Sequence, residues 1–206
     1  MGKTITTYLI DGDPKGTQYA FISNKICQMF VIPRSNLAYL NEQEKLHKPA
    51  FYILIGEDEV TKPQAYIGET ENFKERVKDH DSKKAFWQKA LVFVSKDEDM
   101  TKADVQYLEY RAIVVAKQSN SFVLNENKQI PKAPNLPEHQ RDAMDEFFED
   151  IRFLASFIGS FLTVSKDGHV VSVLFSLRLR LTTGAPNPSP PACRSSARSV
   201  RADRPW

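Results

Sequence analysis

The spacing of hydrophobic residues divides the chain into regions, and the first of these is rich in strand patterns. Apolar runs of strand length at 4–10, 19–22 and 29–32 are separated by turn residues. Ser35 or Asn36 can then cap a short helix that ends near Leu46. We expect residues 1–48 to form a small β-rich accessory module.

A second pattern, in which strands and helices alternate, runs through residues 50–130. Asn72 and Glu75 have the spacing of a helix capping box, and Thr101 and Asp104 open a second helix in the same way. The apolar periods predict strands at 51–56, 64–68 and 91–94 and helices at 70–79 and 101–117. This order predicts an α+β domain, with a small three-stranded mixed or antiparallel sheet flanked by helices.

The third region, residues 136–163, has the period of an amphipathic helix that Pro137 enters in its first turn. Its apolar stripe fits either docking on the domain's own core or binding of a partner. The segment 164–206 predicts a hairpin-like piece around Asp167-Gly168, followed by a disordered tail rich in Arg, Pro and Ser.

Composition places the chain among ordinary globular proteins, with 206 residues, of which 41% are hydrophobic and 26% are charged. Cys27 and Cys193 are far apart and have no Cys or His at ligand spacing, which excludes a disulfide framework and a structural zinc site. No apolar run reaches the ~20 residues that span a bilayer. We therefore expect a cytoplasmic protein without a membrane partner and without a small-molecule cofactor.

The net charge of +2 is unevenly distributed. Seven basic residues and only two acidic ones lie from Lys166 onward, so the preceding residues are net acidic. Attraction to a polyanion would have to come from a local patch rather than from the whole domain.

Several residues between positions 50 and 130 have side chains suited to phosphodiester chemistry. Arg76 and His80 are four apart on one predicted helix and face the same side. Arginine matches a phosphate with two hydrogen bonds, and histidine can move a proton near neutral pH. Glu109 lies at the border of a buried helix face, where a carboxylate needs compensation, for example from a cation.

The order of these residues resembles the GIY-YIG nuclease family. The second motif, Tyr66-Ile67-Gly68, is intact, whereas the first stands as Ala50-Phe51-Tyr52 and lacks its glycine. The resemblance continues over about 75 residues, through Arg76, His80, Glu109 and Asn125. It implies that Tyr52 is the base for an attacking water and that Tyr66 supports it.

The resemblance further implies a cofactor and a substrate. Glu109 would hold a single Mg²⁺ or Mn²⁺, with waters as its other ligands. Asn125 would position the substrate, which would be DNA. A free phenol has a pKa of about 10, so Tyr52 would need a lower pKa, through the metal or Arg76, to act at neutral pH.

Lysines around Arg76 offer two interpretations. Lys74 and Lys84 are candidate substrate-binding residues, and the nearby Lys78, Lys83 and Lys89 with Phe86 and Trp87 extend a possible basic and aromatic surface. The same lysines alternate with Glu71, Glu75, Asp79 and Asp81, which fits a solvated helix face equally well.

The sequence therefore supports two hypotheses. The first is a metal-dependent DNA endonuclease that uses Tyr52, Tyr66, Arg76, His80 and Glu109. The second is a nuclease-derived module that binds nucleic acid or a protein without cleavage, which the altered first motif and the acidic body keep open.

Overall fold

The computed structural model describes residues 2–56, 63–119, 122–124, 126–158, 163–164 and 170–171. All of them lie within one compact unit, Met1–Phe175. This unit has the predicted α+β class.

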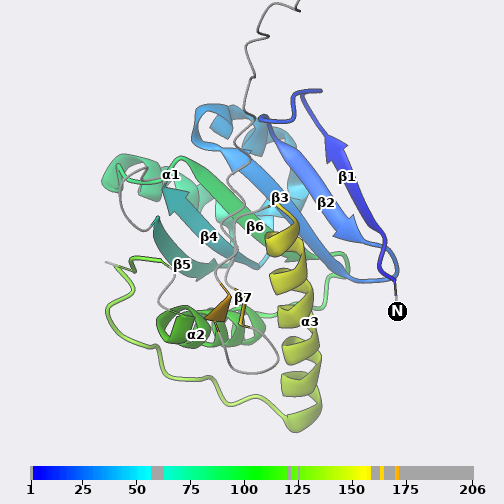
Figure 1. Ribbon diagram of the computed structural model, residues 1–206, viewed down its shortest axis with the longest axis vertical. Helices are drawn as coiled ribbons and strands as arrows, with labels where there is room; N and C mark the ends of the chain where they lie inside the picture. Colours follow the sequence, from blue (N-terminus) through cyan, green and yellow to red (C-terminus); the bar gives the residue numbers. More distant parts are fainter. Residues whose placement is uncertain are drawn as a thin grey trace, which may run out of the picture. The chain divides into compact units, whose positions relative to one another are not determined.

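A six-stranded sheet is the centre of the fold (Figure 1). Its order is β1-β2-β3-β6-β4-β5, and each neighbouring pair is antiparallel. The strands are β1 (Ile5–Leu9), β2 (Gln18–Ile22), β3 (Cys27–Pro33), β4 (Ala50–Gly56), β5 (Gln64–Thr70) and β6 (Lys89–Ser95).

The predicted three-stranded sheet is wrong, because β3 pairs with β6 along its whole length, from Cys27 opposite Ser95 to Pro33 opposite Lys89. Residues 1–48 therefore share one sheet with residues 50–130 instead of forming a sheet of their own. The apolar runs had located all six strands, but the long-range pairing of β3 with β6 had no local signal.

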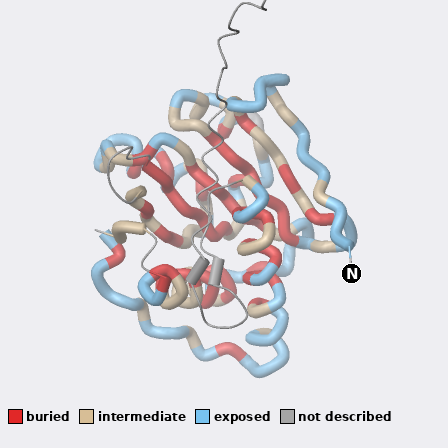
Figure 2. The backbone as a smooth tube through the Cα atoms, viewed as in Figure 1, coloured by how far each residue is buried: buried red, intermediate tan, exposed pale blue. Residues whose placement is uncertain are grey.

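Both faces of the sheet are covered by helices. One face packs against α1 (Phe73–Lys83) and two 3₁₀ helices, η1 (Arg34–Glu42) and η2 (Glu44–His47). The other face packs against α2 (Lys102–Ser119) and α3 (Glu138–Phe157). The middle strands are buried on both sides, whereas β1 is largely exposed (Figure 2). This explains why the middle strands are almost continuously apolar in sequence.

Helices α1 and α2 begin at the positions that their capping-box signals predicted. The Asn72 side chain accepts a hydrogen bond from the backbone N–H of Glu75 at 3.4 Å. At the start of α2, the Asp104 carboxylate accepts from the Thr101 N–H at 2.8 Å, and the Thr101 hydroxyl accepts from the Asp104 N–H at 3.4 Å. Side chains thus satisfy N–H groups that a helix start leaves unpaired.

The helix expected between residues 35 and 46 is instead a pair of 3₁₀ helices. Asn36 has non-helical dihedral angles, and its side chain donates to Asp11 and Thr17 at 2.7 Å each. Asn36 therefore ties this segment to the β1–β2 loop at the expense of a regular helix. Arg34 attaches the same segment to α1, because its guanidinium donates a hydrogen bond to the Asp81 carboxylate at 2.7 Å near the end of that helix.

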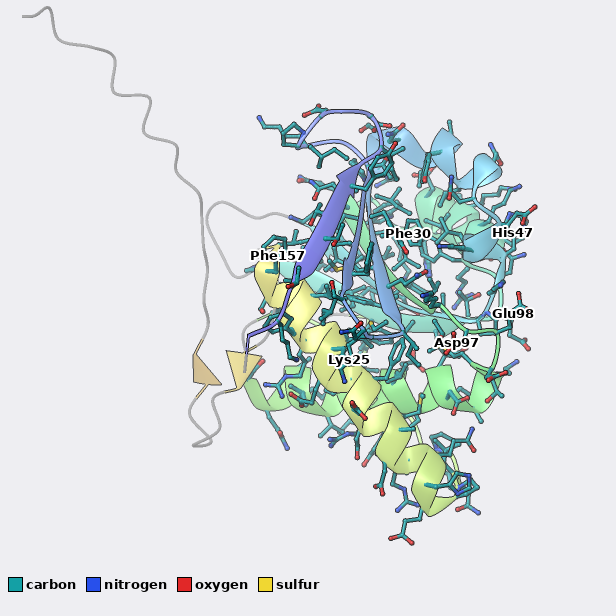
Figure 3. The ribbon with its side chains drawn as sticks, turned by 90° about the vertical axis from the view of Figure 1, so that its right-hand side faces the viewer. Lys25, Phe30, His47, Asp97, Glu98 and Phe157 are labelled. Atoms are coloured by element: carbon teal, nitrogen blue, oxygen red, sulfur yellow. The ribbon has the colours of Figure 1, made fainter. Side chains whose placement is uncertain are left out.

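The apolar stripe of α3 is buried against the sheet and α2 from Met144 to Leu154, which confirms docking on the domain's own core, whereas Phe157 at the end of the stripe is exposed. Lys25, in the β2–β3 turn, forms ion pairs with Glu146 and Asp150 on α3 (Figure 3). On the other side, Asp145 accepts from Arg111 of α2 at 2.9 Å. The helix ends at Phe157, so its predicted extent to residue 163 is wrong.

Beyond α3, β7 (Thr163–Val164) and β8 (Val170–Val171) pair antiparallel, as expected for a hairpin. The predicted turn at Asp167-Gly168 and the predicted disordered tail lie outside the described residues. Among the described residues, no helix is long and apolar enough to cross a membrane.

Candidate active site

The two short motifs lie side by side on β4 and β5. Tyr52 pairs with Gly68, and Leu54 pairs with Tyr66. Because side chains alternate between faces and paired residues share a face, Tyr52 and Tyr66 both project toward α1. Their ring centroids are 6.1 Å apart.

Gly68 is required by the position of Tyr52. A Cβ at residue 68 would lie 2.5 Å from the Tyr52 hydroxyl oxygen and 2.6 Å from its Cζ. The glycine of the intact motif thus leaves room for the tyrosine of the altered one. Ala50, which replaces the other glycine, is fully buried and its methyl group belongs to the hydrophobic core on the same face.

Helix α1 brings Arg76 and His80 to the Tyr52 hydroxyl. The distance from that oxygen to His80 Nε2 is 2.7 Å. Arg76 Nε donates to the same oxygen at 3.3 Å. Four-residue spacing places Arg76 and His80 on one face of α1, and the packing of α1 on the sheet brings that face to Tyr52, so the three side chains form a triad.

Burial fixes the protonation of the triad. The pKa of Tyr52 is raised, chiefly by burial and also by Tyr66, and the opposing effect of Arg76 is smaller. Burial, and then the charges of Arg76 and Lys84, lower the pKa of His80 from 6.5 to about 4. At neutral pH, Tyr52 is a protonated phenol and His80 is uncharged. Tyr52 can therefore donate its proton to His80 Nε2 while it accepts from Arg76.

A cavity of about 270 Å³ opens beside this triad. Its lining includes Arg76 and His80, but Tyr52 is fully buried and does not reach it. The tyrosine that faces the cavity is Tyr66, whose ring centroid lies 5.0 Å from that of His80. The remaining lining residues are Asp79, Lys83, Lys84 and Glu126.

Glu109 lines a second cavity, of about 560 Å³, that meets the first at Tyr66 and Glu126. Glu109 is half-buried on α2, on the opposite side of β5 from Tyr52. Its pKa is raised from 4.5 to about 7, first by burial and then by the neighbouring Glu69, whereas Arg76 lowers it. The influence of Arg76 indicates that Glu109 and the triad belong to one electrostatic environment around the edge of β5.

Glu69 was not singled out from the sequence. It follows the second motif on an edge strand, where an acidic residue is usually a solvated surface group. Only the packing of α2 on β5 reveals that it faces Glu109.

The described residues contain no cluster of three or more His, Cys, Asp and Glu side chains able to hold a metal ion. A site with one protein carboxylate and water ligands would not need such a cluster. Burial and then the neighbouring Glu69 raise the Glu109 pKa, and a divalent cation would offset both of these costs of the ionised carboxylate. The carboxylate oxygens also suit the hard cation Mg²⁺, so the donor set fits.

The two lysines predicted to bind the substrate, Lys84 and Lys74, lie in different surroundings. Lys84 is only 12% exposed, lies 4.2 Å from the Tyr66 ring centroid and forms an ion pair with Glu126. Lys74 lines neither cavity. Lys78 and Lys83 pair with acidic residues of their own helix, as expected for a solvated helix face.

Asn125 lies outside the described residues. Asn127, which was not predicted, is buried, and its side chain bonds both backbone groups of Ile67. Its Oδ1 accepts from the Ile67 N–H at 2.9 Å and its Nδ2 donates to the Ile67 carbonyl at 2.8 Å. Asn127 thus holds the segment after α2 against the outer edge of β5. Nothing in the sequence separated it from the asparagine two residues earlier.

Comparison with protein-family models, with curated proteins and with solved structures found no match.

Proposed function

We propose that this protein is a metal-dependent endonuclease that hydrolyses phosphodiester bonds of DNA. The observation that carries the proposal is the contact of Arg76 and His80 with one buried tyrosine hydroxyl, beside a cavity whose lining includes Arg76, Lys83 and Lys84 as well as Asp79 and Glu126. The ordered resemblance to GIY-YIG nucleases supports the same reaction.

Arg76 would bind the scissile phosphate. Its guanidinium lines the cavity, and its pKa is raised by the Tyr52 hydroxyl, so it stays charged. A fixed cation that faces the phosphate stabilises the charge that develops on its oxygens in the transition state. Removal of such a group typically slows a reaction about 10²–10³-fold.

The aromatic hydroxyls and His80 would carry the proton of the attacking water. Tyr52 is buried, so we place Tyr66 between it and the cavity. A water in the cavity gives a proton to the Tyr66 oxygen, Tyr66 passes its own to Tyr52, and Tyr52 passes its own to His80 Nε2. This direction requires an uncharged His80, which its pKa of about 4 provides at neutral pH.

Glu109 would hold one Mg²⁺ or Mn²⁺, with Glu69 as the second nearby carboxylate. The ion would supply positive charge to the phosphate and the leaving oxygen. Glu109 must be ionised to hold the ion. Because its pKa is about 7, the ionised fraction of Glu109 depends on the pH of the reaction.

A second candidate function is a binding module that holds nucleic acid without cleavage. The burial of Tyr52 favours it, because this hydroxyl has no direct access to the cavity.

Supercoiled plasmid distinguishes the two functions. We expect the purified protein to nick or linearise it with Mg²⁺ or Mn²⁺, and we expect Arg76→Ala, Tyr66→Phe and Glu109→Gln to cut at least about 100-fold more slowly. Lys48→Ala, which removes an exposed lysine paired with Glu98, is the control and should cut at the normal rate.

Unfolding temperatures of all variants establish that they fold. Cleavage that persists undiminished in Arg76→Ala and Glu109→Gln would refute the assigned site. Retained DNA binding without cleavage by any protein would favour the binding module.

A further inference from the structure

Lys84 is an unusually enclosed cation for a residue at the end of an exposed helix. Its side chain is only 12% exposed, and its ammonium group lies over the Tyr66 ring. Its pKa is lowered by burial and by the positive charge of Arg76, which lines the same cavity. Two cations that repel each other in one enclosed space create a site for an anion.

The anion that Lys84 contacts is the carboxylate of Glu126. Glu126 lines both cavities, at the point where they meet. Its neighbour Asn127 is fixed on β5 by its two hydrogen bonds to Ile67. Glu126 is therefore placed beside Lys84 by an anchored backbone, although its own side chain is 38% exposed.

We propose that Glu126 occupies the position of a substrate phosphate at Lys84 and must be displaced when a phosphate ester binds. A phosphodiester offers two charged oxygens, which can serve Lys84 and Arg76 together. The ion pair that the described residues show for the Glu126 carboxylate is with Lys84. The ligand of this subsite is thus a phosphate group, and Glu126 lowers its affinity in the free protein.

This inference deepens the proposed function and rests on it, since it takes the cavity of Arg76 and His80 as the phosphate site. It adds a competition for Lys84 between the Glu126 carboxylate and a bound phosphate. A phosphate that binds Lys84 must break the ion pair of Lys84 with Glu126. The cost of separating that pair offsets part of the binding free energy of the phosphate. Lys84 therefore contributes less to affinity in the normal protein than in one without the Glu126 charge.

The test measures phosphate affinity directly, with no need for cleavage. Inorganic pyrophosphate is titrated by calorimetry into the full chain and into Glu126→Gln, Lys84→Gln and the double variant. Glu98→Gln is the matched control, because it removes one negative charge from an exposed ion pair with Lys48 that lines neither cavity (Figure 3). Unfolding temperatures verify that each variant is folded.

We expect Glu126→Gln to bind pyrophosphate about five- to tenfold more tightly than the normal protein. Loss of the partly exposed ion pair accounts for up to about a fivefold increase in affinity, and loss of the repulsion between Glu126 and the ligand adds to it. Glu98→Gln should stay within about twofold of the normal protein, the size of a distant screened charge. The gain should vanish in the double variant. For a DNA duplex in EDTA, the slope of log affinity against log salt should steepen by about one phosphate contact in Glu126→Gln.

Three results would overturn the inference: no pyrophosphate binding by any protein, equal affinities of Glu126→Gln and Glu98→Gln, or a gain that survives removal of Lys84. Failure of the nuclease proposal alone would give a different set of experimental results. In that case the plasmid stays intact with every protein, while the Lys84-dependent gain in pyrophosphate affinity remains.

Discussion

The close approach of Tyr52 to Gly68 allows a quantitative test of how the site is built. In Gly68→Ala, the new methyl carbon would lie 2.5 Å from the Tyr52 hydroxyl oxygen and 2.6 Å from Cζ. Both distances are well inside van der Waals contact. Tyr52 cannot retreat easily, because its ring is fully buried and packs 5.3 Å from the Phe73 ring, centroid to centroid.

The expected loss of stability has two parts. Overpacking of a buried site typically costs about 1–3 kcal/mol. Displacement of the Tyr52 hydroxyl would also weaken its bonds to His80 and Arg76, each worth about 1 kcal/mol. Since Ala also favours a strand slightly more than Gly does, we expect Gly68→Ala to lower the free energy of unfolding by about 2–3 kcal/mol. In a protein of this size, that corresponds to a fall of about 5–10 °C in Tm.

Urea unfolding, followed by circular dichroism, measures this loss in a double-mutant cycle with Tyr52→Leu. Leucine removes the ring and the hydroxyl that the methyl group meets most closely, so in that background the Gly68→Ala penalty should fall to the smaller cost of the remaining 3.0 Å contact with Tyr66 Cε1. Tyr52→Phe is the matched comparison. It removes only the hydroxyl and leaves the 2.6 Å contact with Cζ, so most of the penalty should remain. An equal penalty in the normal protein and in the Tyr52→Leu background would refute the contact, and no penalty in either would refute the reasoning altogether.

Further predictions concern protonation, metal binding and the altered first motif. Because burial lowers the His80 pKa to about 4, its contribution to stability is present above pH 6.5 and is lost as pH falls to 4; His80→Gln should flatten urea-derived stability over that range. An unchanged pH profile would contradict this. Glu109 acts in the opposite sense, since its pKa of about 7 favours folding at low pH and that contribution is lost as pH rises through 7. Metal should bind its ionised form, so Mn²⁺ should raise Tm more at pH 8 than at pH 6, and Glu109→Gln should abolish the difference; a pH-independent rise would argue against this ligand. Ala50→Gly removes a buried methyl group and frees the backbone, so it should lower stability by about 1–2 kcal/mol without faster plasmid cleavage. A clear gain in cleavage would show that the missing glycine limits the reaction.

The sequence predicted those features whose causes are local. Helices α1 and α2 begin directly after Asn72 and Thr101, because each of these residues forms a capping hydrogen bond with the residue three positions later. Arg76 and His80 share a face because four residues make about one helical turn. The approach of both to Tyr52 could be expected only through the family resemblance.

Features that depend on distant parts of the chain could not be predicted. No local pattern indicates that β3 pairs with β6, or that Tyr52 becomes fully buried while Tyr66 faces the cavity. The ion pair of Lys84 with Glu126 joins residues from two different segments, and although Lys84 was a candidate substrate-binding residue, no pattern in the sequence indicated Glu126 as its partner. Burial raises the Tyr52 pKa, which is opposite to the lowered pKa that Tyr52 would need to act as a base at neutral pH.

The pairing of β3 with β6 has a practical consequence for how this protein can be divided. A fragment that starts at residue 49 would keep every candidate catalytic side chain among the described residues but would leave β6 at the border of the sheet. The uncovered strand, Lys89–Ser95, reads Lys-Ala-Leu-Val-Phe-Val-Ser, a sequence rich in strand-forming residues with a single charge at its start. Unpaired strands of this kind recruit other chains. The segment before residue 49 contains β3, which covers this edge of β6, so we expect a fragment without it to self-associate.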